Sequence, residues 1–197
     1  MRDRLLRWDA RLAVESVEAT LFAVWTSRLP AAFYGPELGG RVSLVQVLRD
    51  LEAERNDEAL GRSLRETLAE LEGRFGANME QWRWGAAHQV HFRHPLGHGD
   101  WDRGPVPRPG NAETVNAAGG SLYRQTSGAS YRHILDLADW DRSVMTNTPG
   151  ESGAPESPYY ANLLDDWAAG RYHPMPFSRK AVEAAAAERI VLVPSRD

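Results

Sequence analysis

The sequence contains no cysteine and only one lysine, Lys180, among its 23 basic residues. Without cysteine there is no disulfide, no thiol nucleophile and no thiolate metal site. Cysteine content therefore does not indicate whether the protein works in an oxidising or a reducing compartment. The 27 acidic residues leave a formal net charge of −4. Affinity for phosphates comes from clustered Lys and Arg, so we expect no nucleic-acid partner.

Long hydrophobic runs are missing as well. No stretch approaches the roughly 18 uninterrupted apolar residues of a transmembrane helix, so no membrane partner is expected. Residues 1–9 are charged from the start and lack the apolar segment of a signal peptide, which leaves the localisation unknown. Hydrophobic residues make up 42% and charged residues 25% of the chain, as in ordinary globular domains.

The first third of the chain has the apolar spacing of helices, with a repeat of three or four residues. Three helices are predicted on this basis, over residues 5–29, 42–51 and 57–75. Pro30 predicts the end of the first helix, because the residue before a proline is pushed out of helical geometry. Gly73 and Gly76 suit the end of the third. Residues 1–85 are therefore expected to be mainly helical.

The remaining residues, 86–197, are predicted to mix strands, long loops and two helices. The predicted strands cover residues 89–92, 113–116, 130–137, 143–146 and 189–193, and the strand over 143–146 is expected to pair with the one over 130–137 through a turn at 139–142. The predicted helices cover residues 159–169 and 179–188, and Ser178 is a good N-cap for the second. The segments 93–112 and 148–158 are rich in proline and glycine, which predicts irregular loops. Helices first and mixed elements afterwards indicate an α+β fold.

Four histidines, His88, His91, His94 and His98, fall within eleven residues. A zinc site needs three or four ligands that converge on one point. On a strand, His88 and His94 share one face while His91 points away, so the set cannot converge without a sharp bend. We therefore expect no metal site, and interpret these imidazoles as groups that cap the backbone beside the proline-rich loop.

Motifs for nucleophilic or cofactor chemistry are weak. Ser152 lies in Gly-Glu-Ser-Gly, half of the Gly-x-Ser-x-Gly turn of many hydrolases, and no helix follows it directly. The Gly119-Gly120-Ser121 run is too short to predict a phosphate-binding loop, so no cofactor is expected. Two carboxylate pairs are interpreted as solvated or capping groups: Asp139 with Asp141, and Asp165 with Asp166.

The order of several motifs resembles that of the penicillin acylase family, which includes penicillin amidases, cephalosporin acylases and acyl-homoserine lactone acylases. In the C-terminal half the resemblance rests on Arg-His-Ile-Leu-Asp at 132–136, Gly-Glu-Ser-Gly-Ala-Pro-Glu-Ser-Pro-Tyr at 150–159, Trp167, Gly-Arg-Tyr-His-Pro-Met at 170–175 and Glu-Arg-Ile-Val-Leu-Val at 188–193. Upstream it rests on Leu-Arg-Trp-Asp at 6–9, Trp84-Gly85 and His-Pro-Leu-Gly at 94–97. It therefore covers almost the whole chain.

This resemblance implies the αββα sandwich of the N-terminal nucleophile hydrolases, with residues 1–197 as a C-terminal portion of the β chain. In the family, a serine at the start of the β chain attacks a linear amide and its own α-amino group acts as base. Met1 is not serine, and Ser121 is followed by Leu-Tyr, unlike the family's nucleophile motif. The expected partners are the remaining α and β acylase segments, and the parent enzyme's substrate is a small-molecule amide.

Asp136 is the one site candidate that the resemblance provides. It stands where some cephalosporin acylases place a carboxylate that orients an active-site histidine. The alternative is a strand carboxylate paired with a neighbouring arginine such as Arg132. Two functions stay open: part of an amidase whose serine lies outside this chain, which alone is inactive, or a catalytically inactive structural or binding protein built on the acylase scaffold.

Overall fold

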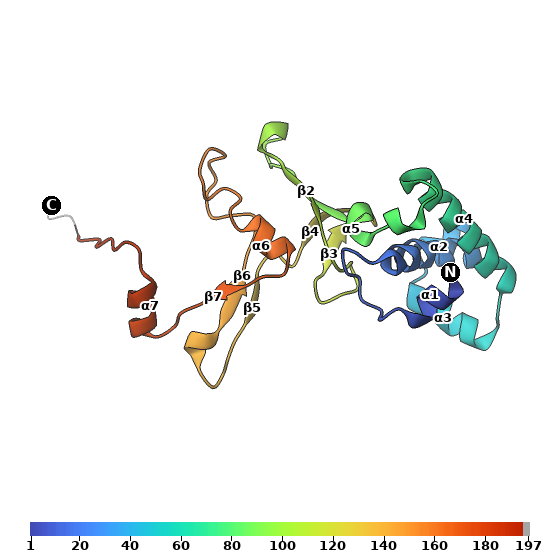
Figure 1. Ribbon diagram of the computed structural model, residues 1–197, viewed down its shortest axis with the longest axis horizontal. Helices are drawn as coiled ribbons and strands as arrows, with labels where there is room; N and C mark the ends of the chain where they lie inside the picture. The colour runs from blue at the N-terminus through green and yellow to red at the C-terminus, as the bar shows by residue number, and fades with distance from the viewer. Residues whose placement is uncertain (195–197) are drawn as a thin grey trace. The chain divides into compact units, whose positions relative to one another are not determined.

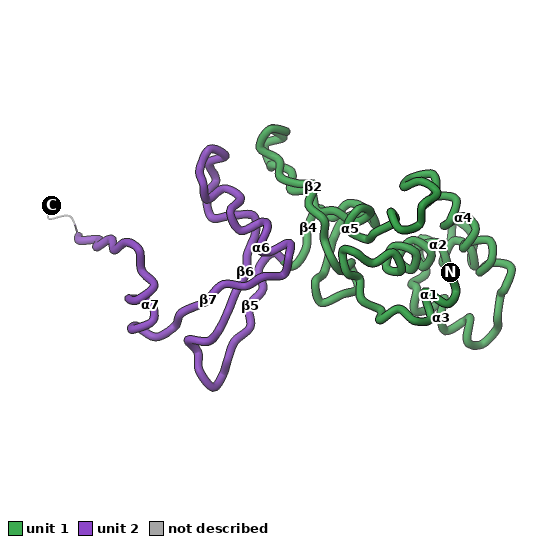
Figure 2. The backbone as a smooth tube through the Cα atoms, in the orientation of Figure 1, with its two compact units in different colours: residues 1–129 green, residues 130–197 purple. Residues whose placement is uncertain are grey.

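The computed structural model describes residues 1–194, and the chain divides into two compact units (Figure 2). Unit 1 is Met1–Ala129 and unit 2 begins at Ser130. The last three residues of the segment predicted as acylase-like, 195–197, lie outside the described part. Helices and strands occur in both units, which confirms the α+β prediction. Among the described residues, no helix is long and apolar enough to cross a membrane.

Unit 1 begins with helices (Figure 1). They are α1 (Arg2–Arg7), α2 (Val17–Gly39), α3 (Leu44–Ala53), α4 (Asp57–Phe75), the short 3-10 turn η1 (Met79–Gln81) and α5 (Trp84–Ala87). Ser16, Ser43 and Asn56 begin α2, α3 and α4, because each side chain accepts a backbone N–H three residues later. Gly76, with φ +85°, ends α4. The predictions over 42–51 and 57–75 are confirmed within two residues.

The single helix predicted over residues 5–29 is wrong. The chain leaves helical geometry between α1 and α2, where Ala10 has a positive φ of 59°. Helix α2 then continues past Pro30 and kinks only at Gly35, whose φ of +80° is outside the helical region. A proline inside a helix costs about 3 kcal/mol. Packing of α2 against α3, α4 and α5 offsets this cost, which local sequence rules do not include.

Four short strands complete unit 1: β1 (Gln89–Phe92), β2 (Arg103–Pro107), β3 (Ala118–Gly120) and β4 (Arg124–Gly128), with the 3-10 turn η2 (Gly99–Trp101) before β2. Their order in the sheet is β2-β1-β4-β3. The prediction of β1 is confirmed. Strand β2 lies in the segment predicted as an irregular loop, and its prolines are tolerated because β2 is an edge strand. The strand predicted over 113–116 is wrong; β3 starts two residues later, where Ala118 pairs with Gly128.

The core of unit 1 lies where α2 packs against α4, α5 and η1. One cluster of buried side chains comprises Val17, Leu21, Val24, Leu71 and Trp82, and a second comprises Ala19, Ala23, Trp84 and Ala87. The indole N–H of Trp84 donates to the carbonyl oxygen of Gly110 at 2.9 Å. Burying a large apolar side chain stabilises the fold by about 2–3 kcal/mol, so Trp84 holds the short helix α5 in place.

Unit 2 contains a three-stranded antiparallel sheet with two short helices. Its elements are β5 (Arg132–Ile134), the 3-10 turn η3 (Trp140–Arg142), β6 (Val144–Thr146), α6 (Leu164–Ala168), β7 (His173–Pro174) and α7 (Arg179–Ala185), and the sheet order is β5-β6-β7. The predicted pairing of β5 with β6 is confirmed, and His133 lies opposite Met145. However, β5 and α6 are much shorter than the predicted 130–137 and 159–169. Strand β5 is limited to three residues, 132–134, and each of them pairs with a residue of β6.

The end of the chain differs from its prediction. Helix α7 is confirmed, because Ser178 accepts the N–H of Ala181 at 3.1 Å, although the helix ends at Ala185. The strand predicted over residues 189–193 is wrong, and the side chains of Ile190 and Leu192 are 82% and 90% exposed. A strand needs a neighbour for its N–H and C=O groups. Within residues 1–194, neither sheet extends to this segment.

Candidate functional site

His88 is the buried member of the histidine group and ends α5. Its Nδ1 lies 2.9 Å from the carbonyl oxygen of Arg108, and its ring stacks on Trp84 with centroids 4.7 Å apart. A carbonyl oxygen only accepts, so Nδ1 carries the proton. Burial lowers the pKa of His88, and the positive charge of Arg108 adds to this lowering, against the opposing hydrogen bond to the backbone. The imidazole is therefore neutral, with Nε2 as an acceptor.

The other clustered histidines lie on β1 and in the loop that follows it. His94 and His98 both pack on Trp101, with ring centroids 4.8 Å and 4.3 Å away. The backbone N–H of His94 donates to the Asp102 carboxylate at 2.7 Å. Burial and the charge of Arg124 lower the pKa of His91. Among the described residues, no three His, Asp or Glu side chains come together as metal ligands.

Ser152 lies in the loop between β6 and α6 and takes part in a turn. Its hydroxyl oxygen accepts the N–H of Ala154 at 3.1 Å, while its own N–H donates to the carbonyl oxygen of Tyr159 at 3.1 Å. A serine nucleophile needs a base within hydrogen-bond reach of its hydroxyl. The contacts of Ser152 are those of a turn residue.

The Asp136 carboxylate is held by the turn that follows β5. Its Oδ1 accepts the backbone N–H groups of Ala138 at 3.0 Å and Asp139 at 3.2 Å. Its Oδ2 lies 3.5 Å from Nε of Arg142. With about a quarter of the side chain exposed, the carboxylate has a fixed orientation and is still reachable from solvent.

The neighbouring arginine beside Asp136 is therefore Arg142, in place of Arg132, the example given for this alternative. Arg132 instead donates to the carbonyl oxygen of Trp167 at 2.7 Å. Its guanidinium also lies over the rings of Trp167 and Tyr172, at 5.7 Å and 5.5 Å. The prediction assumed a strand continuous through residue 136, whereas β5 ends at residue 134.

The Asp139 and Asp141 carboxylates behave as capping groups, as predicted. Asp139 begins η3 by accepting the N–H of Asp141 at 3.1 Å. Asp141 accepts the N–H groups of Phe177 and Ser178, and these hydrogen bonds, led by those from Ser178, hold its pKa below the usual range. Asp166 forms an ion pair with Arg171 at 2.6 Å. These groups are engaged in local structure.

A polar cluster that sequence reasoning missed joins α2, α4 and the turn before β4. Glu70 accepts the Tyr123 hydroxyl at 2.6 Å and pairs with Arg28, and Arg74 lies 4.0 Å over the Tyr123 ring. Burial alone raises the pKa of Glu70, but the hydrogen bonds from Tyr123 and Arg28 outweigh it and hold the pKa below the usual range. Burial and the Glu70 carboxylate raise the pKa of Tyr123.

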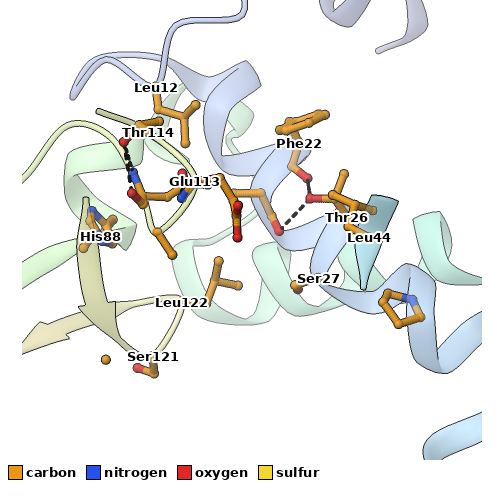
Figure 3. A pocket seen from close by; sticks show the side chains of 16 residues that line it. Leu12, Phe22, Thr26, Ser27, Leu44, His88, Glu113, Thr114, Ser121 and Leu122 are labelled. Atoms are coloured by element: carbon orange, nitrogen blue, oxygen red, sulfur yellow. Dashed lines mark hydrogen bonds between the residues drawn. The ribbon is translucent and has the colours of Figure 1, made fainter. Parts of the chain in front are cut away.

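Unit 1 also contains a cavity of about 470 Å³ that no sequence motif indicated (Figure 3). Its lining comes from five separate parts of the chain, namely the segment before α2, one face of α2, the start of α3, the end of α5, and residues 111–122. The lining residues include Leu12, Phe22, Thr26, Ser27, Leu44, His88, Glu113, Thr114, Ser121 and Leu122. Figure 3 shows the loop residue Glu113 facing α2 across the cavity.

Comparison with known proteins finds a matching family model and several similar acylases. A family model described as penicillin amidase matches residues 1–184. The acyl-homoserine lactone acylase QuiP of Pseudomonas syringae pv. syringae is 24% identical over 231 residues, covering 98% of this chain and 28% of that protein. The penicillin acylase 2 proenzyme of Pseudomonas sp. SE83 is 29% identical over 221 residues, covering 99% of this chain and 29% of the proenzyme. The chain thus spans less than a third of the length of these relatives.

Proposed function

This chain belongs to the penicillin amidase family, and we propose that it forms a C-terminal portion of the β chain of an amidase that hydrolyses linear amides. The match over residues 1–184 carries this proposal, and the acylase names of its relatives support cleavage of a C–N bond outside peptides. In the proposed reaction a serine attacks the amide carbonyl, the amine leaves, and water then releases the acid from the acyl-enzyme.

The serine of this reaction is proposed to come from another acylase segment. This chain then contributes helices and strands to the αββα sandwich. The exposed apolar side chains of unit 2 support such a role, because large apolar patches mark interaction surfaces. Leu137, Phe177 and Ile190 are 78%, 65% and 82% exposed. The acylase segments that would cover them are the proposed partners.

The proposal is tested by reconstitution. The chain is assayed alone and after co-expression with an upstream acylase segment that carries the serine, using phenylacetyl and fatty-acyl anilides. We expect turnover only from the combined segments, and loss of several orders of magnitude when that serine is replaced by alanine. Ser152→Ala is the matched control and leaves turnover unchanged.

Two outcomes contradict the proposal. Turnover by the chain alone that disappears in Ser152→Ala assigns the reaction to this chain. An assembled complex without turnover favours the alternative, a catalytically inactive protein on the acylase scaffold.

Within this assembly, we propose that Asp136 is a positioning residue for a group that another segment contributes. Its support is the fixed carboxylate described above, which leaves Oδ2 with one long contact to Arg142. Asp136→Asn in the active assembly is expected to lower kcat by about 10- to 100-fold, with a smaller change in KM and a shifted pH profile. The exposed Asp165→Asn is the control. Equal effects of both variants on kcat contradict this role.

A further inference from the structure

The cavity of unit 1 has the size and the walls of a small-molecule site. Its volume of about 470 Å³ lies within the range of about 300–1,000 Å³ that ligand pockets occupy. Leu12, Phe22 and Leu122 line it together with alanine side chains, so most of its wall is apolar. Figure 3 shows Phe22 and Leu122 on different sides of the cavity, where they can hold a hydrocarbon group between them.

The cavity has one formal charge, and it is negative. Glu113 is the only Asp, Glu, Lys or Arg among the lining residues. Its backbone N–H donates to Asn111 at 2.9 Å, which fixes the loop that presents the side chain. Within residues 1–194, no arginine or lysine pairs with the Glu113 carboxylate. An apolar cavity beside one carboxylate favours a cationic group on a ligand.

Three side chains of the lining, those of Thr26, Ser27 and His88, offer acceptors to a ligand. The hydroxyl hydrogens of Thr26 and Ser27 are used on helix carbonyls, those of Phe22 at 2.8 Å and Val24 at 2.7 Å. The oxygens of both hydroxyls keep lone pairs. His88 is neutral and gives its one N–H to Arg108, so its other ring nitrogen only accepts. These groups match a ligand that donates hydrogen bonds.

We propose that this cavity binds a small apolar molecule that carries a primary ammonium group. The hydrocarbon part lies against Phe22 and Leu122, and the ammonium donates to Glu113. An ammonium supplies three donors and one positive charge, which suits the acceptors on Thr26, Ser27 and His88 beside a single carboxylate. A carboxylate ligand of the same shape is disfavoured, because its charge would be repelled by the like charge of Glu113.

Titration of the full 197-residue chain with three matched probes tests this site. The probes are benzylamine, benzyl alcohol and benzoate, which share a ring and differ in charge and donors. We expect benzylamine to bind, benzyl alcohol to bind about tenfold more weakly, and benzoate not to bind. Methyl NMR resonances of Leu12 and Leu122 should shift with benzylamine. Because binding requires no turnover, the result is separate from that of the amidase assay.

Three variants test whether the probes bind in this cavity beside Glu113. Glu113→Gln should weaken benzylamine binding about tenfold and leave benzyl alcohol unaffected. Glu37→Gln removes an exposed carboxylate of unit 1 outside the cavity and should change nothing. Ala118→Phe should fill the cavity and abolish binding of both probes. No binding of benzylamine, equal binding of benzoate, or equal effects of Glu113→Gln and Glu37→Gln would overturn the proposal.

Discussion

The two units use their apolar side chains differently. Of the 16 buried apolar residues in the described part of the chain, 13 belong to unit 1 and three, Leu164, Trp167 and Ala168, belong to unit 2. Unit 2 is about half as long, yet 13 of its large apolar side chains are exposed, against eight in unit 1. Apolar burial is the main stabilising contribution to folding. Unit 1 therefore has a core of its own, whereas most of the large apolar side chains in the described part of unit 2 are exposed.

Separating the units is the strongest test of this difference. Residues 1–129 alone should unfold cooperatively, because both buried clusters lie within them. Residues 130–197 alone should show no cooperative transition and should associate. Thermal melting by circular dichroism, combined with size-exclusion chromatography, measures both. A monomeric 130–197 segment with a sharp melt would show that unit 2 is self-sufficient and would remove the main support for its interface role.

Two tryptophans compare the units directly. Trp84→Ala in unit 1 should destabilise the chain by about 3–5 kcal/mol, because it leaves a cavity in the core and the Gly110 carbonyl without its indole donor. Trp140→Ala in unit 2 should cost less than about 1 kcal/mol, since this side chain is 49% exposed. Urea unfolding of both variants gives the free energies. Similar losses of unfolding free energy in the two variants would contradict the difference in apolar burial between the units.

The Glu70 cluster offers a smaller effect. Glu70→Gln should destabilise unit 1 by about 1–2 kcal/mol, because Tyr123 and Arg28 lose a partly buried charged acceptor. The pKa of Glu70 is lowered in the folded state, so this stabilisation is present above the ordinary carboxyl pKa and is lost as the pH falls through the folded value. Glu183→Gln, from an exposed pair with Arg179, is the control and should show no measurable loss.

The smallest expected effect is the pH dependence of unit 1 around His88. Its pKa is lowered on folding, so the unfolded chain binds more protons, and stability falls as the pH drops through about 6.5, the ordinary histidine value. One proton contributes at most about 1.4 kcal/mol per pH unit. His88→Asn should make the decline shallower, with the remainder due in part to His91. The control His133→Gln, in unit 2, should leave the decline of stability with falling pH unchanged. An unchanged slope in His88→Asn would show that His88 is not the source of this decline.

Local patterns were sufficient for several elements. Helices α3 and α4 follow from apolar spacing, and α7 follows from its alanine-rich sequence after the cap Ser178, whose side chain acts within three residues. The β5–β6 pair follows from two apolar segments joined by a turn. The order of motifs along the chain was sufficient for the family as well, because it requires no knowledge of contacts.

The sequence by itself therefore determined the α+β class, helices α3, α4 and α7, and the family. Only the tertiary structure decided the course of α2 through Pro30, strands β2 and β4, the partner of Asp136 and the cavity around Glu113. Each of these depends on residues that are distant in sequence: β1 pairs with β4 across more than thirty residues, and the cavity is lined by five separate segments. Long-range packing and pairing can outweigh the propensities of a short segment, and local patterns do not record which distant segments meet.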